Sequence, residues 1–524
     1  MASAAQYWSP RVRAAAVASI LIINLTLRLC LALRPLGFID ARTLPDDTYL
    51  SLTIARNIAR GEGPSYSGEF TNGFQPLMVY MLAPVFLVAG SDPTVGVHAA
   101  TAISSLFDTL TLLVLCRMIL RRCRGPVPLG VAALAWILNP AGLRTAANGM
   151  ETSMACFFLA SGLSFLDRWA VTGKACARPR TYALLGALAG AGMLARIDLA
   201  AFAVSAAGTI FVIDRRELRR AFVLSAAFAA GLIIVEGPWL AYGYVRTGEL
   251  FPVSGSAIRF MSLATVDFAP TYHNWYSLTL GEGVRALIAD TRAALAVTAG
   301  LLCVLAWTDR RALRDAGRSC AWIVPACACT AILFWAYTLY VFGTWFFERY
   351  MFPACVPLTI ALAAACDVLV HSRVRRPVKN VSLAAAVMLL IALDLTDPAL
   401  GRTLFPSVQA PGGYMPIGLW AARRFPPGTV IAGAQSGALG YFADSLTVIN
   451  LDGVVSPSCY RALRSFRALQ YLRAHGTRYV VGWYSNFQYL EHQSAGMEPH
   501  DLGPLRPITG FRTWGDDWYF AEVR

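Results

Sequence analysis

Apolar runs of about 17 to 25 residues, the length that a membrane-spanning helix needs, recur along the first 400 positions of this chain. An α-helix rises about 1.5 Å per residue, so each run is long enough to cross a hydrocarbon core about 30 Å thick. The whole chain is 56% hydrophobic and only 15% charged, which departs from the usual composition of soluble domains. The sequence therefore predicts an α-helical integral membrane protein, with residues 1–400 as its transmembrane domain.

The positions of Lys and Arg indicate how these runs are oriented. The net charge is +14, and the arginines cluster in short segments between apolar runs, as they do in cytoplasmic loops. We interpret this charge as membrane anchoring and expect no nucleic acid partner. The first run is expected to be a retained span, because no small-residue cleavage site followed by a polar region accompanies it.

The charge rule predicts about 11 spans, with the N-terminus in the cytoplasm and the C-terminus outside. A short run at 76–90 contains Pro84, and a crossing there would place the basic segment 117–124 outside. We therefore interpret 76–90 as a juxtamembrane or re-entrant helix within a first outer loop, 35–95. The expected spans are 12–34, 96–118, 127–143, 152–168, 181–196, 199–213, 221–243, 289–307, 320–341, 351–370 and 379–396.

The last part of the chain, 401–524, lacks long apolar runs and is predicted to be a small extracytoplasmic α/β domain. Its patterns predict a buried strand with a Gly-containing turn in 428–442, a second strand in 445–455, a helix over 461–476 and a third strand in 477–484. The segment GAQSGALG lacks the Lys and Ser or Thr of a phosphate-binding loop, which argues against a nucleotide site.

Once the topology is drawn, polar and ionisable residues from five separate loops gather at the outer ends of the spans. Such groups are costly near a membrane, and they indicate function by default. The residues are Asp46, Asp47, Asn148, Glu151, Arg196, Asp198, Glu249, Ser254, Ser256, Arg259, Glu348, Arg349 and Tyr350.

Each of these groups also has a structural interpretation. Asp46 and Asp47 could cap the helix that follows them, or one of them could act as a general base or bind a cation. Arg196 could hold a ligand phosphate, because its planar fork suits phosphate, or it could simply pair with Asp198. Glu151 could interact with the dipole of the helix that it precedes.

Two further interpretations concern the remaining candidates. Glu348, Arg349 and Tyr350 could form an interfacial anchor with the neighbouring aromatic residues. His273 lies in an outer loop, but no second histidine is spaced to share a metal ion with it, so we expect no zinc site.

Several stretches resemble one known family: LPDDTYLSLTIARNIARGEGPSYSGEFTNGFQPL at 44–77, NGMETSMACFF at 148–158, MLARIDLAAF at 193–202, PWLAYGYVRTGELFPVSG at 238–255 and GALGYFADSLTVINLDGVV at 437–455. They resemble the bacterial polytopic glycosyltransferases of the GT-C superfamily. Within it the pattern is similar to polyprenyl-phosphate-sugar-dependent enzymes such as the mycobacterial terminal arabinofuranosyltransferase. The first stretch is the most specific, and the resemblance extends along essentially the whole chain. The tail is much shorter than in the mycobacterial enzyme, so the sugar and the acceptor do not carry over.

The resemblance implies an inverting transfer of a sugar, arabinofuranose or a hexose, from a polyprenyl-phosphate donor. The acceptor would be a hydroxyl group of a glycan, lipid or protein outside the bacterial inner membrane. Asp46 or Asp47 would be the general base, and Glu151 matches an acidic position of the second outer loop. Relatives differ in using a divalent cation, so Mg, Mn or Ca at Asp46, Asp47 and Glu151 stays open.

The resemblance also implies binding roles for other residues. Arg196, and with it Arg349, would hold the lipid phosphate, while Thr71, Asn72 and Gln75 would line the sugar pocket. Two rival functions remain: a lipid-linked glycan flippase or transporter, and a glycan polymerase. A transporter would favour internal repeats and ionisable residues at mid-bilayer, whereas the candidates here lie at one end of the spans.

Overall fold

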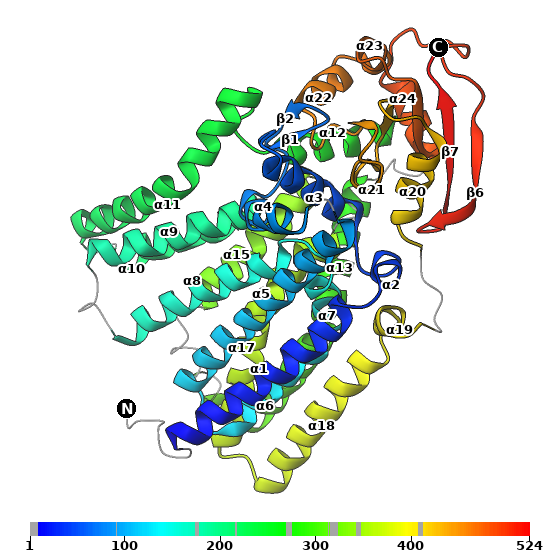
Figure 1. Ribbon diagram of the computed structural model, residues 1–524. Coiled ribbons are helices and arrows are strands. Elements are labelled where there is room, and N and C mark those ends of the chain that lie inside the picture. Colours follow the sequence, from blue (N-terminus) through cyan, green and yellow to red (C-terminus); the bar gives the residue numbers. More distant parts are fainter. Residues whose placement is uncertain are drawn as a thin grey trace.

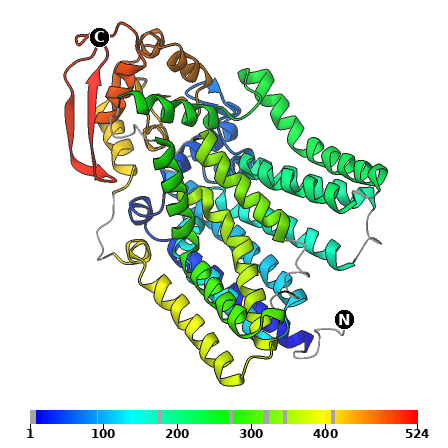
Figure 2. The same cartoon turned by 180° about the vertical axis from the view of Figure 1, so that it is seen from behind.

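Long helices form a bundle, and a small mixed sheet covers one end of it (Figure 1). The computed structural model describes residues 9–90, 92–172, 178–214, 217–268, 275–312, 314, 323–341, 347–406 and 412–524. The two ends of the chain lie at opposite ends of the molecule in both views (Figures 1 and 2). The sheet is therefore remote from the end of the bundle at which the chain begins.

Where the structure describes them, the expected spans all fall on helical structure. Within the described residues, seven helices are long and apolar enough to cross a membrane, or eight if one bent pair counts as a span. Together with the terminal sheet, this confirms the predicted fold class. The bundle helices are α1 (Pro10–Ala32), α5 (Pro93–Arg122), α6 (Pro126–Leu138), α7 (Pro140–Ala146), α8 (Thr152–Thr172), α9 (Pro179–Ala195), α10 (Ala200–Asp214), α11 (Leu218–Thr247), α13 (Trp275–Thr308), α15 (Ile323–Trp335), α17 (Cys355–His371) and α18 (Arg376–Leu395).

The bent pair is α6 and α7, which meet at 62°. Pro140 cannot continue a helix hydrogen-bond ladder, and the Asn139 side chain instead caps α7 by accepting from Gly142 N at 2.9 Å. The break frees carbonyl groups at the end of α6, and Arg28 of α1 donates to two of them. Its Nε also pairs with Asp108 of α5 at 3.1 Å, so three spans are joined around one buried cation.

Helices α9 and α11 pack backbone against backbone. A Cβ atom added at Gly186 would lie 1.9 Å from the carbonyl oxygen of Phe228, and one added at Gly231 would lie 1.9 Å from that of Ala183. Small residues allow such close approach between helices in a membrane, where packing supplies most of the association energy.

The end of the bundle nearer the sheet carries short elements between the spans. Helix α4 has the predicted position but only 14 residues, with Pro84 inside it. In β1–β2 the turn residues Ser67 and Gly68 both have positive φ, as a two-residue hairpin turn requires. The elements are α2 (Leu36–Asp40), α3 (Asp46–Ala59), β1 (Ser65–Tyr66), β2 (Glu69–Phe70), α4 (Pro76–Ala89), η3 (Ile197–Leu199), α12 (Val253–Phe268), η5 (Ala336–Val341), α16 (Phe347–Met351), η7 (Phe352–Ala354) and α19 (Pro398–Leu404).

The tail forms a five-stranded sheet in the order β4-β3-β5-β7-β6, with β3 parallel to β4 and β5, and β7 antiparallel to β5 and β6. The three predicted strands are present as β3, β4 and β5. The predicted boundary at 400/401 falls inside α19, and the division into two domains stays a prediction. The elements are α20 (Met415–Arg424), β3 (Val430–Gly433), α21 (Gly437–Phe442), β4 (Thr447–Asn450), α22 (Pro457–Arg464), α23 (Ala468–Ala474), β5 (Tyr479–Trp483), α24 (Tyr484–His492), β6 (Arg506–Thr513) and β7 (Asp516–Glu522).

The prediction of one helix over 461–476 is wrong. The segment is divided between α22 and α23, because the chain turns at Phe466, which has φ of 54°. A non-glycine residue in this left-handed region cannot continue an α-helix.

The first outer loop holds the tail in place through the ends of α21. Asp46 accepts from the amides of Gly437 and Ala438 at 2.8 and 2.9 Å, while Arg56 donates to the carbonyls of Gly440 and Tyr441 at 3.0 and 2.9 Å. An acidic group at the N-terminus and a basic group at the C-terminus both match the helix dipole. Helix α3 therefore hydrogen-bonds to both ends of α21.

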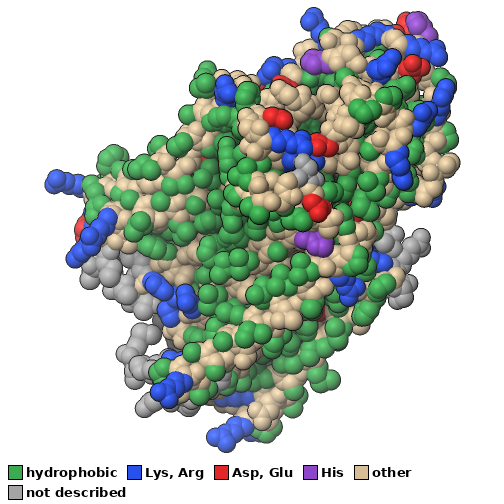
Figure 3. All heavy atoms as spheres, in the orientation of Figure 1, with side chains coloured by type: hydrophobic (Ala, Val, Ile, Leu, Met, Phe, Trp, Pro, Cys, Tyr) green, Lys and Arg blue, Asp and Glu red, His purple; other side chains and the backbone are tan. Residues whose placement is uncertain are grey.

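The molecular surface agrees with a membrane-embedded bundle. Hydrophobic side chains are spread over much of the bundle in Figure 3, whereas charged side chains lie mainly at its edges, in a patch in the upper middle of the view and over the tail. Some of the most exposed apolar side chains lie on α11, where Ile234 and Val245 are 73% and 78% exposed. Such a face is stable in lipid and unfavourable in water.

Candidate active site

The two adjacent aspartates of α3 point to different parts of the molecule. Asp46 is only 8% exposed, and both of its carboxylate oxygens accept amides at the start of α21. Burial raises its pKa to about 7, against the opposing effect of those two hydrogen bonds. The side-chain cap that the sequence suggested for α3 thus caps a distant helix instead.

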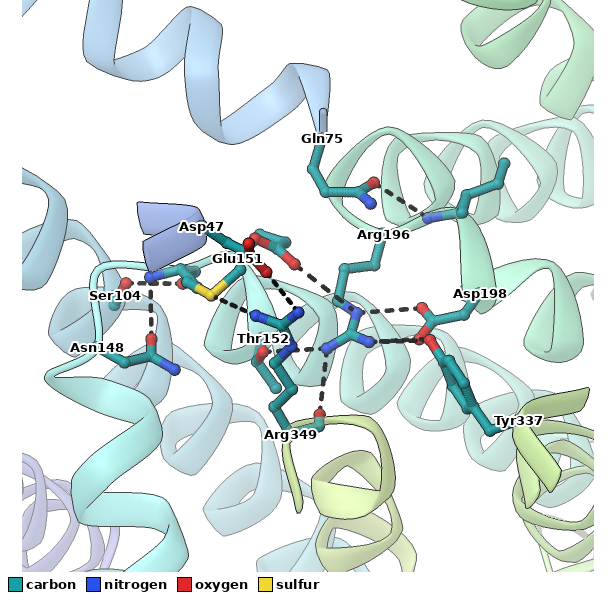
Figure 4. A network of polar contacts seen from close by, with 12 residues as sticks. Asp47, Gln75, Ser104, Asn148, Glu151, Thr152, Arg196, Asp198, Tyr337 and Arg349 are labelled. Carbon is teal, nitrogen blue, oxygen red and sulfur yellow. Dashed lines mark hydrogen bonds and ion pairs between the residues drawn. The ribbon is translucent and has the colours of Figure 1, made fainter. Parts of the chain in front are cut away.

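Asp47 instead points toward Arg349 and Glu151 (Figure 4). Its Oδ2 accepts from Nη2 of Arg349 at 2.6 Å, and its side chain is 33% exposed. The carboxylate is therefore charge-paired and still accessible to solvent. Of the two aspartates, Asp47 has the accessibility that a reacting group needs.

Arg349 lies on the short helix α16, which leads into the span α17. Its guanidinium carbon is 5.3 Å from the ring centroid of Tyr350, and Nη1 lies 3.0 Å from the Met150 sulfur. Tyr350 is in turn stacked on Tyr337, with ring centroids 3.9 Å apart and planes at 7°. This placement on an aromatic platform argues against a simple interfacial anchor, because the groups are directed into the protein.

Arg196 is fully engaged by protein groups at the tip of the α9–α10 hairpin. It is 3% exposed and forms a two-point pair with Asp198, at 3.2 and 2.6 Å. It also donates to Thr152 at 3.0 Å, to the Arg349 carbonyl at 3.1 Å and to the Tyr337 hydroxyl at 3.1 Å. Tyr337 further hydrogen-bonds to Asp198. Arg196 therefore pairs with Asp198, as one of the two interpretations of this residue predicted.

Glu151 lies between the two arginines. It is 6% exposed and its Oε1 is 4.0 Å from Nε of Arg196. Burial raises the pKa of this carboxyl, while Arg196 and Arg349 act in the opposite direction. Two cations thus face three carboxyl groups, those of Asp47, Glu151 and Asp198, in one network (Figure 4).

The segment before Glu151 is fixed by hydrogen bonds from other elements. Thr48 donates to the Asn148 carbonyl at 2.7 Å, and Ser104 donates to the Met150 carbonyl at 2.8 Å. The Asn148 side chain accepts from Met150 N at 2.9 Å. Gly149 has φ of 69°, and an added Cβ there would lie 2.8 Å from a methyl carbon of Thr48. The close approach of α3 thus requires glycine at this position.

The TNGFQ stretch connects the site to neighbouring segments. Asn72 donates to the carbonyls of Glu249 and Phe251 at 2.9 and 3.1 Å and accepts from Val253 N at 3.2 Å. Gln75 accepts from Ile197 N at 3.3 Å, next to Arg196. These side chains position the chain after α11 and the hairpin tip, and their contact with a sugar stays a prediction.

The remaining candidates are Thr71, Ser254, Glu348 and His273. Thr71 accepts from Gly73 N at 3.0 Å within its own turn. Ser254 lies half-buried in the first turn of α12. The side chain of Glu348 and the whole of His273 lie outside the described residues.

Sequence reasoning missed three members of this region: Thr152, Tyr337 and Asp452. Burial raises the pKa of Asp452 to about 8, and the charges of Asp47 and Asp46 act in the same direction, which places Asp452 within electrostatic range of both. Its Oδ1 accepts from Val454 N at 3.0 Å in the turn after β4.

The turn containing Asp452 packs tightly against the first outer loop. A Cβ atom added at Gly73 would lie 1.9 Å from the Val454 carbonyl oxygen. The LDG sequence indicates only a turn, and nothing local in it signals the neighbouring aspartates. The signal for Tyr337 was its presence as a polar aromatic residue in an otherwise apolar span.

A divalent cation does not fit the arrangement of the three candidate ligands. Both oxygens of Asp46 accept backbone amides, Asp47 is paired with Arg349, and Glu151 lies beside Arg196. Among the residues that the structure describes, no group of three or more His, Cys, Asp or Glu side chains is placed to hold a metal ion. The chemistry below therefore contains no step through a metal.

Comparison with known proteins identifies the fold. ArnT from Cupriavidus metallidurans bound to undecaprenyl phosphate superimposes with a TM-score of 0.57 at 14% identity, covering 97% of this chain and 98% of that one. The oligosaccharyltransferase from Archaeoglobus fulgidus, tethered to an acceptor peptide, gives 0.56 at 13% identity, covering 96% and 74%. The chain has a GT-C fold.

A further structure of the Archaeoglobus enzyme, with an inhibitory peptide and a dolichol-phosphate, gives a TM-score of 0.53 at 13% identity, covering 96% of this chain and 74% of that one. In sequence, residues 407–520 match a domain of unknown function, DUF8728, and no curated protein matches the chain. The GT-C fold that the sequence predicted is thus confirmed over nearly the whole length, while the arabinofuranosyltransferase likeness stays a prediction.

Proposed function

We propose that this chain is a glycosyltransferase of the bacterial inner membrane. It would move a sugar from a polyprenyl-phosphate donor to a hydroxyl group of an extracytoplasmic glycan, lipid or protein, with inversion at the anomeric carbon. The GT-C fold supports this proposal, since the similar ArnT structure is bound to undecaprenyl phosphate and an oligosaccharyltransferase structure to a dolichol-phosphate. The observation that carries the proposal is the partly exposed Asp47–Arg349 pair beside the buried Arg196 network.

The arrangement assigns different tasks to the two aspartates. Asp47 would act as the general base, because its carboxylate is accessible, while Asp46 would only fix α21 against α3. In the transfer step the acceptor oxygen attacks the anomeric carbon and the bond from that carbon to the phosphate oxygen breaks. The hydroxyl proton passes to Asp47. General-base assistance of this kind contributes about 10² to 10⁴-fold in rate.

The two arginines also differ in what they can do. Every nitrogen of the Arg196 guanidinium donates to a protein group, so we assign it to positioning Asp198, Tyr337 and the Arg349 backbone. Arg349 would stabilise the departing phosphate, since it bonds to one carboxylate oxygen at the partly exposed edge of the network. A fixed cation is most effective there, where charge develops on the leaving group.

The decisive experiment compares Asp47→Asn and Asp46→Asn in the purified full chain. The assay follows transfer from a radiolabelled polyprenyl-phosphate sugar in membranes or nanodiscs. We expect Asp47→Asn to lose about 10²-fold or more of the rate at unchanged folding, in line with the loss of a general base. Asp517→Asn provides a control, because Asp517 forms an exposed pair with Arg512 in the β6–β7 hairpin of the tail. Near-normal transfer by Asp47→Asn would refute the assignment.

A further inference from the structure

A second group of arginines lines a hollow of about 220 Å³ between the bundle and the tail. Its walls come from α12, η5 and α22, so three separate parts of the chain meet there. The lining residues are Ser256, Arg259, Phe260, Tyr340, Tyr460 and Arg464. Tyr340 comes from the same segment, η5, as Tyr337 of the site already described.

The charge of this hollow is unbalanced in the described residues. The Arg259 guanidinium lies 4.7 Å from the ring centroid of Tyr340, and that of Arg464 lies 5.7 Å from the centroid of Tyr460. Neither arginine forms an ion pair with a carboxylate that the structure describes, and Nε of Arg259 is buried there without a hydrogen-bond acceptor. Arg196 and Arg349, by contrast, are each paired with an aspartate.

Two cations that line the same small hollow repel each other, and the buried Nε of Arg259 lacks an acceptor among the described residues. A phosphate or carboxylate group would offset both effects, because a guanidinium binds such anions with two parallel hydrogen bonds. The tyrosine rings and Phe260 add flat apolar walls, and the Ser256 hydroxyl adds a further donor. The hollow is smaller than the roughly 300 Å³ at which drug-sized sites begin, so it suits one sugar residue or one anionic group.

We propose that this hollow is an oxyanion subsite that holds a phosphate or carboxylate group of the acceptor substrate. The assignment of this group to the acceptor substrate rests on the proposed function. Tyr460 and Arg464 belong to the tail, which lacks spans, whereas the prenyl chain of a donor has to stay among the apolar helices. In the proposed function the donor phosphate is held by Arg349, so the two anionic groups would occupy separate subsites.

The test uses the purified full chain in nanodiscs, with inorganic phosphate and glucuronate as probes and sodium chloride at matched ionic strength as reference. Thermal unfolding is measured against probe concentration for wild type, Arg259→Gln, Arg464→Gln and a control, Arg467→Gln. Arg467 is exposed and lies between α22 and α23, so its removal takes away one charge without changing the hollow. We expect a saturable rise in Tm for wild type and control, and at least about tenfold weaker binding for the two variants, since each loses charge-assisted hydrogen bonds. An unchanged rise in Arg259→Gln and Arg464→Gln would overturn the proposal.

A second arm separates acceptor from donor. The titration is repeated in nanodiscs that contain a polyprenyl monophosphate. We expect the response to phosphate and glucuronate to persist, and its loss would show that the hollow belongs to the donor. In the Asp47→Asn background, Arg259→Gln and Arg464→Gln should weaken probe binding as they do in wild type. Failure of transfer chemistry and failure of the anion subsite are thereby observed in different measurements.

Discussion

Asp46 and Asp47 are neighbours in sequence, yet they belong to two regions with opposite properties. Asp46 lies at the contact between the first outer loop and the tail, where its oxygens are saturated by the amides of Gly437 and Ala438. Asp47 lies in the arginine network, where one oxygen meets Arg349 and the side chain is 33% exposed. A carboxylate saturated by fixed amides serves to hold structure, whereas an accessible one is able to exchange partners.

Asp40, like Asp46, is saturated by groups of the protein. Asp40 accepts from the amides of Tyr414 and Met415 at the start of α20 and from the Tyr49 hydroxyl at 2.6 Å. Two acidic residues of the first outer loop thus fix two helices of the tail. The first outer loop thus both holds the tail and supplies the proposed base. Changes to Asp40 and Asp46 should therefore lower stability, whereas a change to Asp47 should lower activity.

The largest difference between the effect on activity and the effect on stability is expected for Asp47→Asn. We expect transfer from a polyprenyl-phosphate sugar to fall by about 10² to 10⁴-fold, since the base is replaced by a neutral isostere. The Tm should change little, because the side chain is partly exposed. Single-turnover transfer and thermal unfolding on the same preparation measure the two effects. A large drop in Tm with normal transfer would reverse the roles that we assign.

The next largest effect is expected on folding when the buried pair at the hairpin tip is broken. Arg196→Gln leaves the Asp198 carboxylate and the Tyr337 hydroxyl without their cation. Breaking a buried pair in this way costs about 3–5 kcal/mol. Denaturant titration in detergent should show the loss.

The double variant Arg196→Gln with Asp198→Asn is the matched control, because the Asp198 charge is removed together with that of Arg196 while Glu151 keeps Arg349. We expect it to recover part of the lost stability while transfer stays low, as the Arg349 carbonyl also loses its donor. Equal stability of the single and double variants would mean that the pair is not coupled.

A smaller effect is expected for Asp46→Ala. The change removes the acceptors for two amides at the N-terminus of α21, and loss of such a cap costs about 0.5–2 kcal/mol. Limited proteolysis should show earlier release of the tail, and transfer per folded molecule should stay well above that of Asp47→Asn. Equal loss of transfer in both variants would remove the distinction between the two regions.

Sequence alone predicted the parts of this fold that depend on local pattern. Apolar runs such as 12–34 and 351–370 recur with helical length, and α1 and α17 fall on them. Strands β3, β4 and β5 follow from short apolar runs, whereas the β6–β7 hairpin was missed. Its turn residues Trp514 and Gly515 do have positive φ, but the weak alternation of its strands gave no clear signal.

The candidate site was predictable only as a set of residues, not as a set of contacts. The paired aspartates indicated function because two carboxylates exceed the needs of one cap. Which of the two meets Arg349 and which meets α21 depends on partners about 300 and 390 positions away. No local pattern encodes such pairings, and the same reason hid Asp452, whose significance depends on Asp46 and Asp47 across the contact with the tail.

The smallest expected effect is a change in pH dependence. Desolvation raises the pKa of Asp452 to about 8 from an ordinary value near 3.8, so folding favours its protonated form. Its contribution to stability is therefore complete below about pH 3.8 and is lost progressively as the pH rises toward 8. Asp452→Asn keeps the shape and cannot ionise. The Tm of the variant should consequently fall less steeply between pH 5 and pH 8, by roughly 1–3 °C per pH unit.

The pKa of Asp452 links the tail to the first outer loop. Asp452 is placed where the charges of both Asp46 and Asp47 oppose its ionisation. In Asp47→Asn one of those charges is gone, so the pKa of Asp452 should fall and the slope of Tm against pH should lessen even with Asp452 intact. Thermal unfolding of the two single variants and the double variant over the same pH range tests this coupling. If the effects of the two changes simply add, Asp452 does not sense Asp47, and the tail does not share the electrostatic environment of the proposed base.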